Sequence, residues 1–376
     1  MTLPSIAIIG GGIVGSTAAY YLSRAGYCVT LFDEGTGQAT KASAGIICPW
    51  FTLRRNKPWY FLVSNGAEFY RKMMADLTED GLDTQDIFQE DGALIIRKNI
   101  ASLERDLEQG ALKRETAPAI QAIKTVPSNQ LKEYFPLLET EYDATFVQGG
   151  ARLDGAALIN TLHQAIEQFG GHIVRDRAQL IRQEDAILVQ TNANAPKGFD
   201  RILLAAGAWL PELLNPLGYQ VDIRPQKGQL YSVYNDAWRN QHYPVIMPPG
   251  KIDIIPFNNG EIVIGASHED DQGYDLTLDT VQLQALADKA HEWVPSICEM
   301  PHYRTKVGIR AYSSDYAVLV GQIPSANNIW AISGLGSSGL TSGPFLGYQW
   351  SQLIQTGQWA IDAKDFPIER YITPLY

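Results

Sequence analysis

Residues 5–33, SIAIIGGGIVGSTAAYYLSRAGYCVTLFD, contain the pattern that decides the fold. Residues 5–9 are an apolar, β-branched run that ends at glycine, which predicts a buried strand. Residues 13–25 carry apolar residues at helical spacing and stop at Gly26, and residues 28–32 form a second apolar run. Two fully buried strands joined by a helix predict a parallel pair with a right-handed crossover.

The turn between the first strand and the helix carries Gly10-x-Gly12-x-x-Gly15. Gly10 allows a tight turn, Gly12 lets a pyrophosphate approach the backbone, and Gly15 lets the helix pack closely. The helix N-terminus offers free N–H groups and a positive dipole end to the phosphates. Asp33 ends the second strand, about 20 residues beyond the glycines, where an acid binds a ribose 2′-hydroxyl. This context favours a dinucleotide site over a ligand-free turn, and the acid disfavours NADP.

A second glycine motif, Gly334-x-Gly336-x-x-Gly339, follows a predicted strand at 329–333. It could be interpreted as a site for NAD(P)H, but too little chain remains for a second strand, helix and ribose-binding acid. A flexible turn into a packed helix is an alternative. We favour a helix N-terminus directed at the cofactor, where its dipole would stabilise negative charge.

The rest of the chain alternates between two patterns of secondary structure, one of helices with buried strands and one of short antiparallel strands. Asp154 can cap a helix that ends at 170–171, and residues 201–206 form another buried strand. Between about 223 and 267 the pattern changes to short strands separated by turns, which is typical of an antiparallel sheet, and a helix follows at 281–294. We therefore expect an α/β protein in which a Rossmann-like dinucleotide-binding domain is interleaved with an antiparallel-sheet α+β substrate domain. The expected ranges are 1–80, 145–222 and 303–376 for the first domain, and 81–144 and 223–302 for the second.

Composition narrows the class of protein. The chain has 376 residues, 45% hydrophobic and 10% aromatic, which is typical of a globular protein rather than a disordered one. The net charge of −11 makes nucleic acid or an anionic membrane an unfavourable partner. Residues 1–23 are uncharged, but they lack a basic start and contain a glycine triplet, so we expect neither a signal peptide nor a membrane span. Three cysteines without a CxxC pair favour a reducing cytoplasm, and the six histidines show no metal-binding spacing.

Further segments, spread over much of the chain, are similar to segments of a known protein family. They are Ala205–Trp209, Pro225-x-Lys227–Gly228–Gln229, Gly265–Ala266–Ser267, Gly308–Ile309–Arg310 with Asp315 and Gly321, and 334–341 (GLGSSGLT). With the opening motif, they resemble the D-amino-acid oxidase superfamily of FAD-dependent oxidoreductases, most closely its glycine oxidase and D-amino-acid dehydrogenase branch. NAD proteins share the glycine motif, so the expectation of FAD rests on the resemblance.

The resemblance implies a noncovalent FAD site, because Gly308 stands where sarcosine oxidases carry the cysteine that tethers flavin. The residues that it implies for cofactor binding are Gly10, Gly12, Ile13, Val14, Gly15, Asp33, Glu34, Thr40, Ser43, Ala44, Gly45, Ile46, Gln179, Ala206, Gly207, Gly334, Leu335, Gly336, Ser337, Ser338, Gly339, Leu340 and Thr341.

The chain departs from the family pattern around the expected substrate. Ala311 replaces the usual proline after the arginine, and Leu335 replaces a histidine. Asp253 stands where glycine oxidases present a tyrosine, and Ser337 stands where they have a second arginine. These departures leave the identity of the substrate open.

Arg310, Asp253 and Ser337 are the candidate catalytic residues. A guanidinium binds a carboxylate through two hydrogen bonds, so Arg310 is expected to hold a substrate carboxylate; an ion pair with Asp315 is the alternative. Asp253 could meet a substrate amine or face solvent on an amphipathic strand. The acidic run at 268–271 could suggest a cation site, but a solvated loop is the expected interpretation.

The predicted activity is oxidation of a small amino acid, such as glycine, sarcosine or a D-amino acid, at its α-C–N bond. Hydride transfer to flavin would leave an imine, which water hydrolyses to a keto acid and ammonia, and no general base is required. Oxygen or another electron acceptor, such as a quinone or dye, would reoxidise the flavin. A flavin-binding protein without turnover is the alternative, and the sequence leaves a homo-oligomer open.

Overall fold

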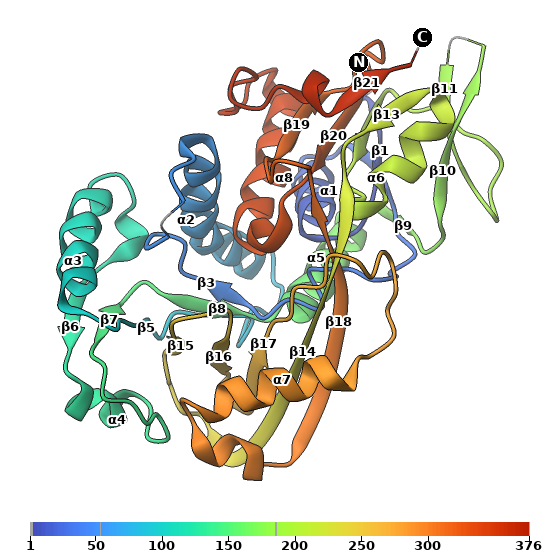
Figure 1. The fold of residues 1–376 in the computed structure, drawn as a ribbon. Coiled ribbons are helices and arrows are strands. Elements are labelled where there is room, and N and C mark those ends of the chain that lie inside the picture. The colour runs from blue at the N-terminus through green and yellow to red at the C-terminus, as the bar shows by residue number, and fades with distance from the viewer. Residues whose placement is uncertain (1–2, 53, 185, 376) are drawn as a thin grey trace.

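The computed structural model describes residues 3–52, 54–184 and 186–375, and its two large sheets are shown in Figure 1. The six-stranded sheet has the order β19-β20-β12-β1-β2-β9. Its strands are β1 (Ser5–Ile9), β2 (Cys28–Phe32), β9 (His172–Val174), β12 (Arg201–Leu204), β19 (Leu319–Gln322) and β20 (Ile329–Ser333). All neighbours are parallel except β19 and β20. The predicted strand–helix–strand unit is confirmed, with α1 spanning Ile13–Arg24.

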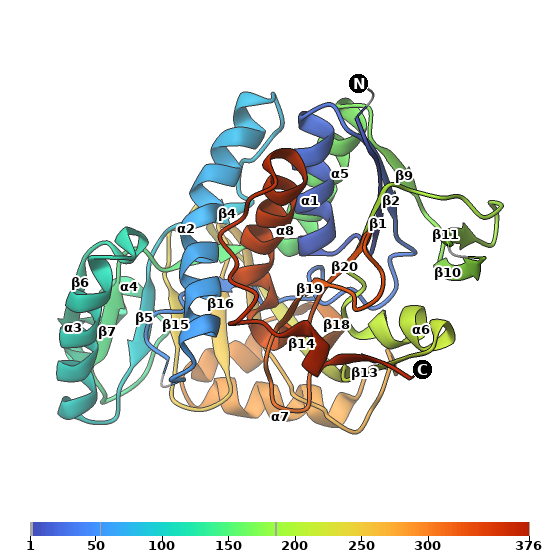
Figure 2. The same cartoon turned by 90° about the horizontal axis from the view of Figure 1, so that it is seen from above.

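Each face of this sheet has its own core, because successive side chains of a strand point to opposite faces. On β1, Ile6 and Ile8 belong to one apolar cluster and Ala7 and Ile9 to another. Helices α1, α2 (Lys57–Glu79), α5 (Gly155–Gln168) and α8 (Gly339–Thr356) gather on the first face (Figure 2). The second face carries β10 (Ala178–Gln183), β11 (Ala186–Thr191), α6 (Leu210–Leu214), β13 (Tyr219–Val221) and β21 (Ile372–Pro374).

Two local features explain how the helices pack on the first face. The carboxylate of Asp154 accepts hydrogen bonds from the N–H groups of Ala156 and Ala157, which confirms the predicted cap of α5. Helices α1 and α8 cross closely at Gly347, where a Cβ atom would lie 2.4 Å from the Val14 carbonyl oxygen. The glycine therefore permits the contact that brings the N-terminal ends of α1 and α8 to one region.

The eight-stranded sheet has the order β18-β14-β17-β16-β15-β5-β7-β6. All neighbours are antiparallel except β15 and β5. Alternate apolar residues such as Ile262 and Ile264 pack with α7 (Thr280–His291). Helices α3 (Ile100–Arg114) and α4 (Leu131–Tyr134) lie toward the β6 edge (Figure 1). The strands are β5 (Ala93–Ile96), β6 (Ile123–Val126), β7 (Ala144–Val147), β14 (Arg224–Arg239), β15 (Val245–Met247), β16 (Asp253–Pro256), β17 (Asn259–Gly265) and β18 (His302–Tyr312).

Short elements complete the chain. A three-stranded sheet joins β3 (Ile46–Ile47), β8 (Ala151–Leu153) and β4 (Phe88–Gln89). The 3₁₀ helices are η1 (Pro118–Ile120), η2 (Ser128–Gln130), η3 (Gly207–Trp209), η4 (Asn215–Leu217), η5 (Pro295–Glu299), η6 (Gly336–Ser338) and η7 (Ile368–Arg370). No helix within the described ranges is long and apolar enough to cross a membrane.

The two sheets follow the predicted fold class, α/β with interleaved parts. The six-stranded sheet lies within the ranges expected for the cofactor domain, and β7 and β18 of the other sheet extend across the expected boundaries. We retain the division into two domains as a proposal. Some element ends differ from the prediction: the strand expected at 201–206 ends at Leu204, and the helix expected at 281–294 ends at His291, shortly before Pro295.

Candidate active site

A cavity of about 1340 Å³ lies at the carboxyl ends of β1, β2, β12 and β20 and extends to β14, β16 and β18. Carboxyl ends of parallel strands are the usual ligand sites of open α/β sheets. All of the residues that the sequence implied for cofactor binding line this cavity except Gly15, and so do Arg310 and Asp253. Residues from distant parts of the chain are therefore brought to one continuous space.

The first glycine motif is used in two different ways. Gly10 has a φ of +105°, and a Cβ atom there would lie 2.3 Å from the Ala205 carbonyl oxygen. A Cβ atom on Gly15 would lie 1.9 Å from the Gly10 carbonyl oxygen, so Gly15 serves packing and does not reach the cavity. Gly12 differs, because its φ is −74° and the nearest atom to its Cβ position is Thr40 Oγ1 at 3.5 Å. The protein itself would accommodate a side chain at Gly12, so the space before it is left for a ligand.

Asp33 lies on the cavity wall at the end of β2, beside the glycine turn. Burial raises the pKa of its carboxyl group, and hydrogen bonds from the N–H groups of Gly11 and Gly35 oppose this shift. The side-chain amide of Gln38 donates to the carboxylate. Gln179, another residue that the resemblance implied for cofactor binding, lies on β10 and also lines the cavity.

The second glycine motif forms a turn that enters α8 at the cavity. A Cβ atom on Gly336 would lie 2.1 Å from the Tyr312 ring, and the Ser337 N–H donates to Tyr312 Oη at 2.9 Å. The Trp59 indole N–H donates to Ser338 Oγ at 2.9 Å. The N-terminus of α8 therefore faces the cavity, and side chains of α2 and β18 hold the turn in place.

Arg310, on β18, carries a guanidinium whose protein partners are neutral. Its Nη1 donates to Gln226 Oε1 and to the Ser267 carbonyl oxygen, both at 3.0 Å. Gly228 lies against the guanidinium, since a Cβ atom there would come within 2.7 Å of it. Burial lowers the pKa of Arg310, and the negative charge of nearby acids opposes this shift.

The alternative role for Arg310, an ion pair with Asp315, is absent from the structure. Asp315 Oδ2 instead lies 2.9 Å from Arg370 Nη2 and accepts a hydrogen bond from Tyr371 Oη at 3.1 Å. Among the described residues, no carboxylate oxygen lies within 4.0 Å of the Arg310 guanidinium nitrogens. A half-buried cation without an acidic partner on the wall of a cavity is suited to bind an anion.

Asp253 begins β16 and lines the cavity, so the alternative of a solvent-facing position on an amphipathic strand is wrong. The two residues that follow it, Ile254 and Ile255, are fully buried. Burial raises the pKa of Asp253 to about 7. Burial also raises the pKa of the neighbouring Cys48 thiol to about 12, which keeps that thiol neutral. Asp253 is therefore a carboxyl group that changes charge near neutral pH.

The run at 268–271 is a turn in which His268, Asp270 and Asp271 are exposed and Glu269 is half-buried, in agreement with the solvated loop that the sequence predicted. His268 lines the cavity, and burial and the charge of Arg310 lower its pKa to about 4. Glu269 and Asp270 are hydrogen-bonded to side chains of β14, and no group of three metal-binding side chains occurs among the described residues.

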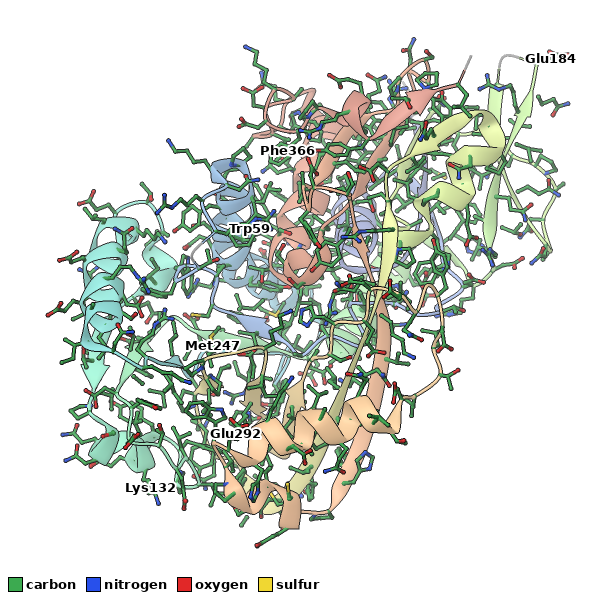
Figure 3. The ribbon with its side chains drawn as sticks, in the orientation of Figure 1. Trp59, Lys132, Glu184, Met247, Glu292 and Phe366 are labelled. Carbon is green, nitrogen blue, oxygen red and sulfur yellow. The ribbon has the colours of Figure 1, made fainter. Side chains whose placement is uncertain are left out.

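Sequence reasoning did not assign several other cavity residues. Lys251 follows β15 and lies close enough to lower the pKa of His268. Trp59 on α2 and Met247 at the end of β15, both labelled in Figure 3, also line the cavity.

Comparisons with known proteins agree with this geometry. A family model described as FAD dependent oxidoreductase matches residues 5–353. The chain is 34% identical to an uncharacterized oxidoreductase, YurR, of Bacillus subtilis, over 97% of this chain and 98% of that protein. It is 27% identical to a glycine oxidase of Pseudomonas aeruginosa over 90% and 91% of the two chains. The crystal structure of an iminodiacetate oxidase from Chelativorans sp. BNC1 is 28% identical and superposes with a TM-score of 0.90 over 98% of both chains.

Proposed function

Because the chain belongs to the FAD-dependent oxidoreductases of this family, we propose that it oxidises a small amino acid at the α-C–N bond. The observation that carries the proposal is Arg310, a half-buried guanidinium with neutral partners in the same cavity as the glycine turn. Glycine, sarcosine and D-amino acids are the proposed substrates. An N-carboxymethyl amino acid joins them because a solved relative is an iminodiacetate oxidase.

The residues present fit FAD. The cavity of about 1340 Å³ exceeds the usual range for a single small ligand, and Gly12 leaves space where a pyrophosphate would approach. We propose that the FAD is noncovalent, because Gly308 offers no nucleophile and the buried Cys48 thiol is neutral. When bound, FAD supplies an acceptor for hydride.

The side chains have separate roles in the proposed reaction. Arg310 holds the substrate carboxylate, which fixes the α-carbon relative to the turn at Gly334–Thr341. Asp253 in its ionised form attracts the substrate ammonium group, and in its neutral form does not repel the carboxylate. The N-terminus of α8 contributes a positive dipole end that stabilises negative charge in the cavity. No step assigned to the protein requires a general base.

The proposed reaction is a two-electron oxidation of the substrate followed by hydrolysis of the product imine. The substrate ammonium group first releases a proton to water. The free amine then loses a hydride from the α-carbon and a second proton, from nitrogen to water, which gives an imine. Water then adds to the imine and releases an oxo acid and ammonia, or a primary amine if the nitrogen was substituted. The two electrons pass to oxygen or to another acceptor, such as a quinone or dye.

The first test is the cofactor content of the purified protein. We expect a yellow protein that releases intact FAD on denaturation. Flavin that remains attached to the denatured chain would contradict noncovalent binding, and bound NAD without flavin would contradict the use of FAD.

The second test is anaerobic mixing with glycine, sarcosine, D-alanine and iminodiacetate, followed by admission of oxygen or a dye. Bleaching of the flavin absorbance by one or more of these compounds is the expected result, and the reoxidation rate identifies the acceptor. Methylamine, which lacks a carboxylate, is the control and should bleach poorly. If none of the amino acids bleaches the flavin, the protein binds flavin without this turnover and the proposal is wrong.

We also propose a cytoplasmic location. The three cysteines, Cys28, Cys48 and Cys298, are free thiols, as a reducing compartment favours. Cell fractionation with detection of the flavin enzyme checks this placement.

A further inference from the structure

Two acidic side chains lie near Arg310, yet neither pairs with it. The negative charges of Glu269 and Asp270 act on the Arg310 guanidinium and oppose the lowering of its pKa by burial. Among the described residues, the guanidinium nevertheless donates to an amide oxygen and a carbonyl oxygen and to no carboxylate. An acid paired with Arg310 would compete with a ligand carboxylate, so the arrangement that prevents pairing matters for binding.

The strand register places one acid on each face of the sheet. β14 and β18 pair Gln226 with Arg310 and Lys227 with Ile309, so Gln226 shares the face of Arg310 and Lys227 points to the other face. The backbone of Glu269 exchanges hydrogen bonds with that of Lys227, at 3.0 and 3.1 Å. Glu269 therefore shares the face of Lys227, away from Arg310.

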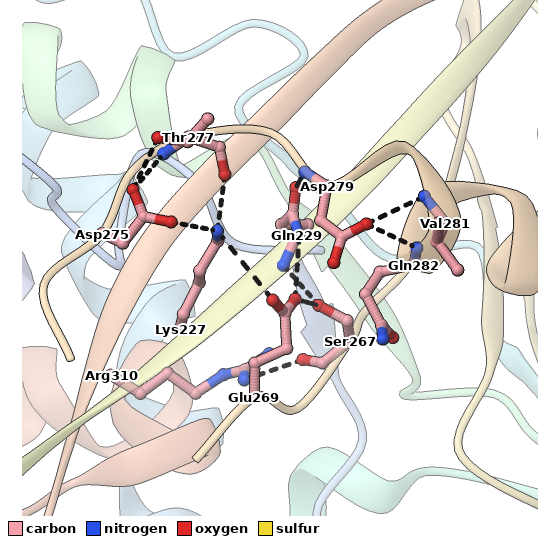
Figure 4. Close-up of polar contacts among 10 residues, drawn as sticks. All are labelled: Lys227, Gln229, Ser267, Glu269, Asp275, Thr277, Asp279, Val281, Gln282 and Arg310. Atoms are coloured by element: carbon pink, nitrogen blue, oxygen red, sulfur yellow. Dashed lines mark hydrogen bonds and ion pairs between the residues drawn. The ribbon is translucent and has the colours of Figure 1, made fainter. Parts of the chain in front are cut away.

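Glu269 is held on that face by three donors, as Figure 4 shows. Gln229 Nε2 donates to Glu269 Oε1 at 2.9 Å, the Ser267 hydroxyl donates to the same oxygen, and Lys227 Nζ lies 3.9 Å from Oε2. Lys227 is 2% exposed and also pairs with Asp275 at 3.0 Å. Hydrogen bonds from Thr277, and then from Lys227, lower the pKa of Asp275 to about 2. A buried ammonium is thus fixed between two acids.

Asp270 is separated from Arg310 by one amide group. The amide nitrogen of Gln226 donates to Asp270 Oδ1 at 2.7 Å, and its oxygen accepts from Arg310 at 3.0 Å. Gln226 is 5% exposed. A primary amide has one acceptor and one donor end, so this residue can contact the acid and the cation at once without neutralising either.

We propose that Gln226 and Lys227 are positioning residues that keep Asp270 and Glu269 from pairing with Arg310, and so leave its charge for a carboxylate ligand. The inference rests on the proposed function, in which Arg310 holds the substrate carboxylate. Gln226 insulates Arg310 on its own face of the sheet, and Lys227 retains Glu269 on the opposite face. Neither residue is assigned contact with substrate.

The isosteric change Gln226→Glu tests the first half of the proposal on the holoenzyme. It places an acid against Arg310 without a change of size, so binding of propanoate, a carboxylate without an amine, should weaken at least about tenfold. The measurement is the Kd from flavin absorbance, with KM expected to rise more than kcat falls. Gln284→Glu, the same change on the exposed side of α7, is the matched control and should bind as the wild type does. A Kd for Gln226→Glu within about twofold of the wild-type value would overturn the proposal.

A charge-rescue experiment tests the second half. Lys227→Met leaves Glu269 without its cation and should weaken propanoate binding, while Lys227→Met with Glu269→Gln removes both charges and should restore most of the affinity. A double variant that binds as weakly as Lys227→Met would overturn the role of Lys227, since lost packing alone would not be rescued. Failure of the proposed function has a different signature: wild type and Arg310→Ala would then show the same Kd for propanoate.

Discussion

The cofactor end and the substrate end of the cavity are formed by different parts of the chain, the first mainly by backbone and the second by side chains. The cofactor end is shaped mainly by backbone: Gly10 and Gly15 allow a tight turn, and Gly12 leaves open space within the same short segment. The substrate end is lined by side chains of three separate segments, Asp253, His268 and Arg310, and Gln226 contacts Arg310 from a fourth segment. A backbone site depends on the spacing of residues close in sequence, whereas a side-chain site depends on how distant strands pair.

Of the variants discussed, Gly12→Val should produce the largest effect. It should disrupt FAD binding at the cofactor end and leave the substrate end of the cavity unchanged. Because φ at Gly12 is −74° and the nearest atom to its Cβ position is 3.5 Å away, the folded chain tolerates the valine, but its methyl groups fill the space of the pyrophosphate. FAD per polypeptide should fall at least about tenfold with little change in Tm. Gly198→Val in an exposed loop is the control, and flavin content near the wild-type value in Gly12→Val would contradict the assignment.

Arg310→Ala should break the substrate end and leave the cofactor end intact. A charge-assisted pair is worth about 1.5–3 kcal/mol, so kcat/KM for an amino acid should fall about 10- to 100-fold with normal FAD content. Arg310→Lys should recover little, because an ammonium lacks the planar two-point contact. Steady-state kinetics on glycine and on methylamine measure the effect, and equal losses on both would show a structural role.

Gly228→Ala tests a glycine that shapes the substrate end. A Cβ atom there would lie 2.7 Å from the Arg310 guanidinium, which must then shift. We expect propanoate to bind roughly threefold to tenfold more weakly, less than in Arg310→Ala, at unchanged FAD content. Unaltered binding would show that the guanidinium is not fixed against this backbone.

Asp253→Asn should produce the smallest effect, visible as a change in pH dependence. The folded-state pKa of about 7 lies above the ordinary carboxyl value, so the group favours folding at low pH, and that contribution is lost as pH rises through 7. Its new negative charge also opposes a ligand carboxylate, so wild-type affinity for propanoate should fall a few-fold between pH 6 and 8. His268, with its pKa near 4, stays neutral over this range. The Asn variant should show a flatter profile, and an unchanged profile would assign the titration to another group.

Sequence alone predicted the elements whose signals are local. The ends of β1 and β2, the start of α1, the Asp154 cap and the strand at 329–333 all follow from periodicity, glycine stops and capping chemistry. The gathering of the implied FAD residues at one cavity followed from the same strand–turn–helix spacing and from the family resemblance.

The partners of Arg310 could not be predicted in this way. Gln226 and Ser267 lie 84 and 43 residues from it, and their contact depends on the register of β14 against β18 and on the segment that follows β17. No local pattern encodes a register between distant strands. For the same reason, Asp253 had two open interpretations, and the sequence did not show that the exposed run after Ser267 contributes His268 to the cavity wall.

The central claim is that one cavity holds FAD against the glycine turn and a carboxylate against Arg310. A crystal structure of the holoenzyme with bound propanoate tests it most directly. The predicted result is a pyrophosphate at Gly12 and a propanoate carboxylate within hydrogen-bonding distance of the Arg310 guanidinium, with Gln226 still between Arg310 and Asp270. A carboxylate bound elsewhere, at Lys251 for example, with Arg310 paired to Asp270 or Glu269, would contradict the account.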